Sequence, residues 1–236
     1  MLLGVTMMIA GGCQRSIFRQ YEYEEEIYLK LDGSATMMIN ASIPALIALR
    51  GLDLNPDPAA RPDRDKIREL YAAPSVAVTR VSPPWRRNGR RFVQIRMDVS
   101  DIRQLARSAP LAWSTYQFTT NGKEYHYRQV WGAPADKPLP NVNWDGSEIV
   151  AVRMHLPSRI EYHNATSRKV DRGNIVGWEQ PLKDRLAGKP LEMEVRMQTQ
   201  SILYRTLTIF CIALAAALAL MAAIVVWVKK KGAPAA

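Results

Sequence analysis

The residues best suited to metal or acid–base chemistry are the three histidines of this 236-residue chain, His126, His155 and His163. His155, Glu161 and His163 share the same parity along neighbouring predicted strands, so one sheet face could present all three to a metal ion. Pro157 lies between them and breaks the register, and no further ligands cluster nearby. We therefore expect surface or hydrogen-bonded histidines and no metal site.

Motifs for catalysis are missing from the sequence. It contains no G-x-S-x-G nucleophile elbow, no P-loop, no dinucleotide fingerprint and no H-E-x-x-H pair. A carboxylate pair such as Glu24 and Glu26 is typical of a solvated face, because no apolar setting in the sequence would raise a carboxyl pKa. We expect neither enzyme activity nor a cofactor. A hydrolase that uses His155 or His163 is the weakest alternative.

Basic side chains concentrate in the stretch Arg80–Arg96, at the predicted tip of a hairpin. Each Lys or Arg near an anionic membrane surface gains about 1 kcal/mol, and an indole ring suits the membrane interface. We expect this tip to contact membrane lipid, with a solvated hairpin end as the alternative. The residues predicted to make the contact are Trp85, Arg86, Arg87, Arg90 and Arg91.

The segment Ile209–Val228 contains no charged residue and is followed by three lysines, Lys229–Lys231. As a helix it would be about 30 Å long, the thickness of the hydrocarbon core of a bilayer. It is apolar all round, whereas a helix in a protein core needs an apolar stripe on one side only. We therefore expect a transmembrane helix over residues 203–228 and a cytoplasmic tail over 229–236. By the positive-inside tendency, the main domain then lies outside the cytoplasm, at the bacterial inner membrane.

The N-terminal sequence MLLGVTMMIAGGC is apolar up to Cys13. Small residues before a Cys, ahead of a polar stretch, resemble the lipobox of a bacterial lipoprotein signal peptide, in which the Cys becomes the lipidated first residue. Ala10 stands where Leu is usual, and no Lys or Arg precedes the apolar stretch. We expect a signal peptide over residues 1–12 and lipidation at Cys13. An ordinary signal peptide, an uncleaved anchor and a start codon placed too far downstream are the alternatives.

Residues 13–202 are expected to form one extracytoplasmic domain. The second of the two cysteines, Cys211, lies in the predicted span, so the domain has neither a disulfide nor a thiol nucleophile. All 22 acidic residues and all but three of the 32 Lys and Arg residues precede the uncharged segment that begins at Ile209. The domain is therefore basic, and on an exported domain this charge favours membrane lipids over nucleic acid as partners.

Alternating apolar and polar residues predict strands along most of the domain. Asp32-Gly33-Ser34 and Asn121-Gly122 are turn signals between neighbouring strands. The predicted strands are Tyr21–Leu31, Ala35–Ile43, Val76–Val81, Arg91–Val99, Trp113–Thr120, Lys123–Trp131, Glu148–Leu156, Arg159–His163, Asn174–Trp178 and Leu191–Gln200.

Short helices are expected at Arg64–Tyr71, Ile102–Arg107 and Pro181–Leu186. Long strands with a few interspersed helices predict an α+β domain built on a curved antiparallel sheet, with one C-terminal transmembrane helix. Aromatic residues on the strands are expected in the core. They are Trp113, Tyr116, Tyr125, Tyr127, Trp131 and Trp178.

The segment His163–Leu182, with its ending W-E-Q-P-L, precedes a short helix, a strand and the C-terminal span. This arrangement resembles the LppM-like domain of bacterial envelope lipoproteins, as does the opening, a Cys followed by a strand–D-G-S–strand hairpin. The resemblance covers most of residues 13–228 in layout. It implies a lipidated, single-span protein whose curved sheet is similar to lipid-carrying helix-grip folds, and it implies no catalytic residue. Relative to that family, the Pro-rich stretch Asn55–Pro62 is an insertion before the first helix.

These features together predict a non-enzymatic envelope domain that binds lipid or lipoglycan in an apolar pocket between sheet and helices. The alternative is a structural partner of a larger envelope complex, whose helix and basic loops dock on other proteins.

Overall fold

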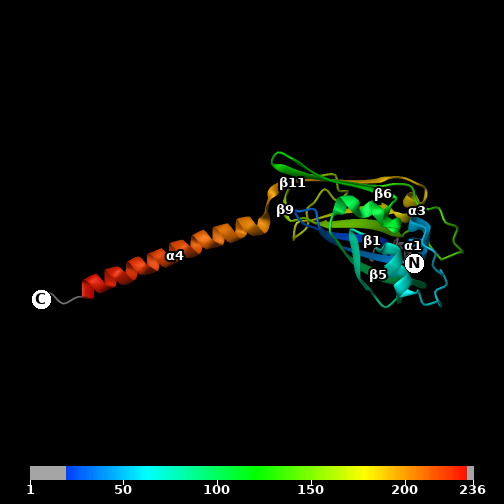
Figure 1. The fold of residues 1–236 in the computed structure, drawn as a ribbon, viewed down its shortest axis with the longest axis horizontal. Helices are drawn as coiled ribbons and strands as arrows, with labels where there is room; N and C mark the ends of the chain where they lie inside the picture. The colour runs from blue at the N-terminus through cyan, green and yellow to red at the C-terminus, as the bar shows by residue number, and fades with distance from the viewer. Residues whose placement is uncertain (1–19, 233–236) are drawn as a thin grey trace, which may run out of the picture.

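The computed structural model describes residues 20–232, which form a mixed α+β domain and one long helix that extends away from it (Figure 1). The expected fold class is confirmed. Cys13 and the predicted signal peptide lie outside the described residues, so both stay predictions.

The strands of the described residues form two sheets, not the single antiparallel sheet that we expected. In the larger, seven-stranded sheet the order is β10-β8-β1-β2-β5-β3, and the short β4 also pairs with β5. The pair β1–β8 is parallel, because the chain reaches β8 only after a long excursion through the second sheet. The strands are β1 (Tyr21–Leu29), β2 (Ala35–Ser42), β3 (Val76–Val81), β4 (Trp85–Arg87), β5 (Arg90–Val99), β8 (Ile149–His155) and β10 (Ile175–Pro181).

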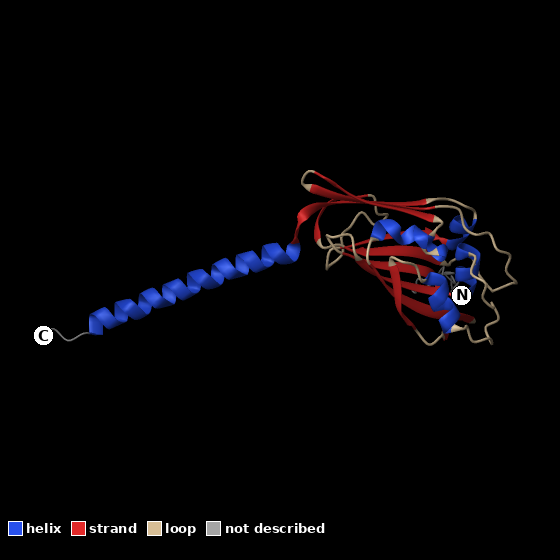
Figure 2. Cartoon of the chain, in the orientation of Figure 1, coloured by secondary structure: helices blue, strands red, loops and turns tan. Residues whose placement is uncertain are grey.

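The smaller sheet covers one face of the larger sheet (Figure 2). Its four strands have the order β6-β7-β11-β9 within the described residues. The two sheets share one core, in which the Tyr23 ring of β1 meets the edge of the Trp131 ring of β7, with centroids 5.6 Å apart. The strands are β6 (Ser114–Asn121), β7 (Glu124–Trp131), β9 (Ser158–His163) and β11 (Leu191–Ser201).

Helix α1 (Ile43–Arg50) follows β2 directly and was not predicted. All eight of its residues are buried, so it has no polar face whose spacing would mark a helix in the sequence. The Ser42 side chain caps its first turn by accepting a hydrogen bond from the Ala45 backbone N–H at 3.1 Å. Gly51 ends it with a φ of 70°. The Pro-rich stretch 55–62 therefore follows the first helix, contrary to our expectation.

The other short helices lie where the sequence predicts them. The segment Ile102–Arg107 is a 3₁₀ helix, and a second 3₁₀ turn follows it directly. In the β6–β7 hairpin Asn121 pairs with Glu124, so the two-residue loop is Gly122 and Lys123, one position later than expected. The helices are α2 (Arg64–Tyr71), η1 (Ile102–Arg107), η2 (Ala109–Leu111) and α3 (Leu182–Leu186).

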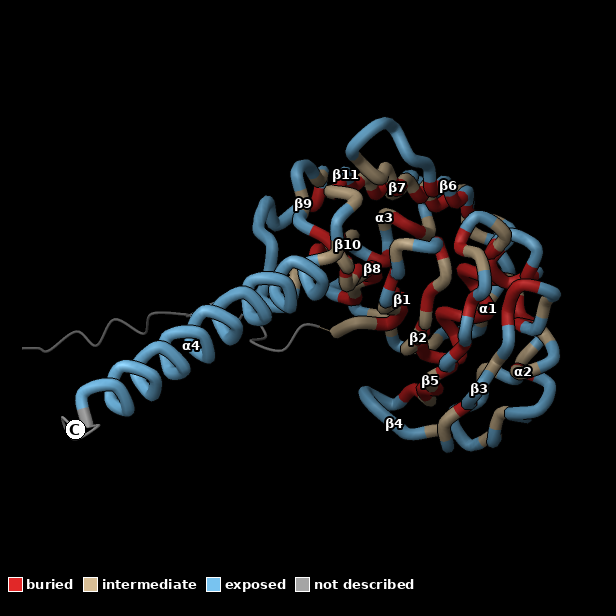
Figure 3. The backbone as a smooth tube through the Cα atoms, turned by 60° about the vertical axis from the view of Figure 1, so that its left-hand side comes forward, coloured by how far each residue is buried: buried red, intermediate tan, exposed pale blue. Residues whose placement is uncertain are grey.

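Helix α4 (Ile202–Gly232) continues from β11 without a loop and is exposed along its described length (Figure 3). Its most apolar window has a mean hydropathy of 3.0, and none of that window is buried. A core helix would bury one face against the domain, whereas this one presents apolar side chains all round. The expected C-terminal helix that could span a membrane is therefore confirmed, while its orientation stays a prediction.

Candidate functional site

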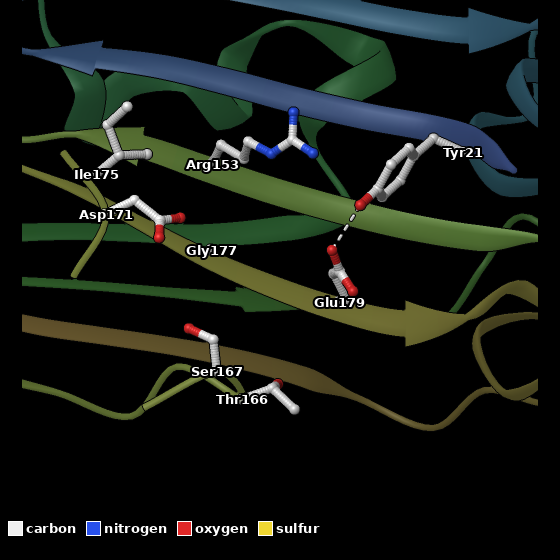
Figure 4. A pocket seen from close by; sticks show the side chains of 8 residues that line it. All are labelled: Tyr21, Arg153, Thr166, Ser167, Asp171, Ile175, Gly177 and Glu179. Atoms are coloured by element: carbon white, nitrogen blue, oxygen red, sulfur yellow. Dashed lines mark hydrogen bonds between the residues drawn. The ribbon is translucent and has the colours of Figure 1, made fainter. Parts of the chain in front are cut away.

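A groove of about 490 Å³ lies on the outer face of the larger sheet, opposite the core (Figure 4). Strands β1, β8 and β10 lie side by side beneath it, and the loop between β9 and β10 supplies its far wall. The lining residues are Tyr21, Arg153, Ile175, Gly177 and Glu179 from the strands, with Thr166, Ser167 and Asp171 from the loop.

The alternation of β10 determines which of its side chains face the groove. Val176 and Trp178 are buried in the core, so Gly177 and Glu179 point to the opposite face. A Cβ atom added to Gly177 would lie 3.9 Å from the Val152 carbonyl oxygen, which is ordinary van der Waals contact. Gly177 therefore leaves the floor of the groove free of a side chain, although the backbone at this position would accept another residue.

The polar groups of the groove are held in fixed orientations. The Tyr21 hydroxyl donates a hydrogen bond to Glu179 Oε1 at 2.6 Å (Figure 4). The Arg153 guanidinium lies 5.1 Å from the centre of the Tyr21 ring and forms an ion pair with Glu24, with Nη1 and Oε1 2.6 Å apart. An aromatic face, a guanidinium, carboxylates and hydroxyls thus converge on one surface.

The Glu24 side chain is partly buried, whereas we expected it to be solvated. Burial raises the pKa of its carboxyl above the ordinary value, while the nearby Arg153 opposes this shift. The expectation that Glu24 lacks a setting that raises its pKa is therefore wrong. Its carboxylate is paired with Arg153, which gives it a structural partner beside the groove.

The histidines are hydrogen-bonded, as predicted. His155 Nε2 lies 2.8 Å from Glu26 Oε1, and His126 Nε2 lies 3.1 Å from Glu194 Oε1. His155 belongs to the larger sheet, whereas Glu161 and His163 belong to the smaller one, so the three do not share one sheet face as the metal site would require. Among residues 20–232 no cluster of three His, Cys, Asp or Glu side chains could hold a metal ion.

Arg90, one of the predicted lipid-contacting residues, is buried in the domain. Its guanidinium lies 2.8 Å from Glu22 Oε1 and 3.5 Å from Glu148 Oε1, and it donates to the Asn143 carbonyl at 2.9 Å. Its strand parity is that of the exposed Arg96 and not of the core residues Val93 and Ile95. Arg90 is buried because the loop that carries Val142 and Asn143 covers it, and it donates to both of their carbonyls. Arg90 thus forms buried ion pairs, and the prediction that it contacts membrane lipid is wrong.

The other predicted contact residues lie on the hairpin of β4 and β5, where Trp85 is partly exposed and stacks on Phe92. Arg86 Nη2 donates to the Pro58 carbonyl at 2.7 Å, and Arg91 Nη2 donates to the Ala59 carbonyl at 3.1 Å. Both arginines therefore hold the Pro-rich loop against the hairpin. Lipid contact by Trp85, Arg86, Arg87 and Arg91 stays a prediction.

The hairpin and α4 lie at opposite ends of the larger sheet. Arg87 donates to the backbone carbonyl of Tyr21, at the start of β1. Strand β8 runs parallel to β1 and ends at His155, beyond which the Pro157 carbonyl accepts a hydrogen bond from the Ile202 N–H at 3.0 Å. About 25 Å of strand separates these two ends. The hairpin reaches a bilayer spanned by α4 only if the strands lie along the membrane plane.

The predicted core aromatics are buried or partly buried, as expected. Tyr127, Trp131 and Trp178 are almost completely excluded from solvent, and the Trp113 ring lies 3.5 Å from the Arg50 guanidinium. These side chains and a buried ion pair lie in the core that the two sheets share, and the apolar pocket expected between sheet and helices stays a prediction. The groove on the outer face is the site at which the domain offers fixed polar groups to a ligand.

Neither a protein-family model nor a curated protein matches the sequence. Among solved structures, the chain is similar to the folded domain of LppM from Mycobacterium tuberculosis, determined by NMR. The TM-score is 0.43 and the sequence identity 17%, over 79% of this chain and 95% of that chain. We carry neither a residue role nor a function over from this similarity.

Proposed function

We propose that the chain is a membrane-anchored, non-enzymatic extracytoplasmic domain that binds the sugar-bearing head group of an envelope lipoglycan. The observation that carries this proposal is the lining of the outer groove. A sugar offers many hydroxyl groups and one apolar ring face, which suit oriented carboxylates and hydroxyls beside an aromatic ring. Tyr21, Arg153, Asp171 and Glu179 supply such groups from rigid strands and one loop.

The position of the groove supports a ligand that is itself anchored in the membrane. Ile175 lines the groove, and the neighbouring Asn174 lines a second cavity that includes the first turns of α4. If α4 crosses the bilayer, a head group in the same leaflet enters the groove at Ile175 and extends along the strands to reach Tyr21 at the start of β1. Tethering both partners to one membrane raises their effective concentration, so a shallow groove suffices for binding.

The test is to purify the full chain from membranes and identify its co-purified lipids by mass spectrometry. Gly177→Leu adds a side chain that projects into the groove, and Gln117→Leu places the same leucine on the exposed outer face of β6, away from the groove. We expect the wild type and Gln117→Leu to retain a lipoglycan that Gly177→Leu loses. Equal lipid content in all three proteins would overturn the proposal. Crosslinking to one fixed protein regardless of the groove would favour the assembly role instead.

A further inference from the structure

A second cavity, of about 360 Å³, lies where the domain joins α4. Its walls come from β9, from β11 and from the first two turns of the helix. The lining residues that matter here are Arg159 of β9, Gln198 and Gln200 of β11, and Arg205 and Ile209 of α4. None of these residues belongs to the outer groove.

A distortion of the smaller sheet creates this cavity. In the pairing of β11 with β9, Met197 faces Ile160 and Ser201 faces Ser158. Three residues of β11 therefore oppose the single residue Arg159, so β11 bulges away and leaves space beside that arginine.

The charge of the cavity is positive. Its lining includes the guanidinium groups of Arg159 and Arg205 and no carboxylate. Arg159 Nε lies 3.7 Å from Glu161 Oε1, but that oxygen already accepts a hydrogen bond from Gln198 Nε2 at 2.6 Å. Within residues 20–232 Arg205 forms no salt bridge. Two guanidinium groups that face one cavity can both donate to the oxygens of a phosphate.

The position along α4 fixes the depth of the cavity in a membrane. The uncharged segment begins at Ile209, so Arg205 lies about 6 Å outside the hydrocarbon core. That depth falls within the polar head-group layer, which extends roughly 5–8 Å beyond the core on each side. Exposed Ile209 continues from the cavity along the helix toward the bilayer and offers an apolar path for an acyl chain.

We infer that this cavity binds the phosphate of an anionic phospholipid in the leaflet on the domain side. Arg159 and Arg205 hold the phosphate from opposite walls, and the acyl chains follow α4 into the bilayer. The inference rests on the proposed function only in requiring α4 to cross a membrane. It does not depend on a ligand in the outer groove.

The experiment compares lipid retention by the full chain in nanodiscs of phosphatidylcholine that contain phosphatidylglycerol as a minor component. Native mass spectrometry of the released protein measures the ratio of the two lipids. The variants are Arg159→Gln, Arg205→Gln and the double variant. Arg196→Gln is the matched control, because Arg196 lies over the Tyr162 ring outside the cavity.

We expect the wild type and Arg196→Gln to retain phosphatidylglycerol preferentially. Each cavity variant should lose about fivefold of this preference, and the double variant should lose nearly all of it. An unchanged preference in the double variant, or an equal loss in Arg196→Gln, would overturn the inference. Displacement of the lipid by millimolar inorganic phosphate would show a site for the free anion and overturn the assignment to lipid.

Carbonate washing of the membranes separates this result from failure of the proposed function. Loss of the chain in the wash would show that α4 does not span, and both proposals would fail. A retained chain with lipoglycan absent but the phosphatidylglycerol preference present would overturn the groove proposal alone.

Discussion

Arg50, the last residue of α1, forms an ion pair with Glu25 of β1 in the domain core, and both side chains are fully buried. Arg50 Nε also donates to the Tyr23 hydroxyl at 2.9 Å, and Gln129 Nε2 donates to the other Glu25 oxygen at 3.0 Å. These contacts connect α1 to the larger sheet and, through Gln129 of β7, to the smaller one. Packing of the two sheets therefore depends on the pairing of two buried charges.

Removing one partner of this pair should destabilise the domain strongly. We expect Arg50→Met or Glu25→Gln to lower the free energy of unfolding by about 3–5 kcal/mol, because the other group stays buried without its partner. The double change Glu25→Gln with Arg50→Met should cost less than the two single losses combined. Urea unfolding measures these values. Arg128→Gln, which breaks an exposed pair with Glu192, should cost far less, because solvent screens an exposed ion pair. A similar loss for buried and exposed pairs would contradict the prediction.

Glu24 should make stability fall as pH rises. Burial raises its folded-state pKa above the unfolded value, so the folded state binds the proton more tightly and loses this contribution as pH rises through the raised pKa. Glu24→Gln cannot ionise and should gain stability relative to the wild type between about pH 4 and pH 7. Thermal unfolding at both pH values tests this. An opposite trend would mean that Arg153 outweighs burial.

Asp101→Asn is the control for Glu24→Gln, because its stability relative to the wild type should change with pH in the opposite direction. A side-chain hydrogen bond from Arg103 lowers the pKa of Asp101, so its ionised form stabilises the folded state and this contribution is lost as pH falls. Asp101→Asn should therefore lose stability relative to the wild type as pH rises from about 2 to about 5. Matching trends for Asp101→Asn and Glu24→Gln would contradict both assignments.

The arginines of the β4–β5 hairpin should hold the Pro-rich loop. The double variant Arg86→Gln with Arg91→Gln removes the hydrogen bonds to the Pro58 and Ala59 carbonyls. We expect faster proteolytic cleavage within residues 55–62, because a loop without its partners opens more often. Binding of the same variant to anionic liposomes tests the lipid contact predicted from the sequence. Unchanged proteolysis with lost liposome binding would favour the membrane role over the structural one.

A charge in the middle of α4 should weaken membrane anchoring. Leu218→Arg places a guanidinium near the centre of the uncharged segment, at a cost of about 2.5–3.5 kcal/mol on insertion scales. Leu203→Arg makes the same change in the exposed first turn, outside that segment, and should be tolerated. The fraction that resists carbonate extraction measures the difference. Equal extraction of the two variants would contradict the assignment of α4 as a span.

Much of the architecture follows from local patterns in the sequence. The strand Val76–Val81 and the helix Arg64–Tyr71 were predicted with their observed bounds, since period-two alternation and an Asp63 cap are local signals. The span was also predictable, because a bilayer requires a helix to be apolar on every side. Helix α1 was not predicted, because a fully buried helix has no polar face.

The sequence by itself determined the class of the domain, the position of most strands and the presence of a helix that could cross a membrane. Only the tertiary structure decided which side chains meet. It buried Arg90 with Glu22, separated His155 from His163, and brought Tyr21, Arg153 and Glu179 together across three strands. Periodicity reports which face of a strand is buried, but strand order and register depend on contacts between residues far apart in the chain. The groove and the cavity at α4 can therefore be identified only from the tertiary structure.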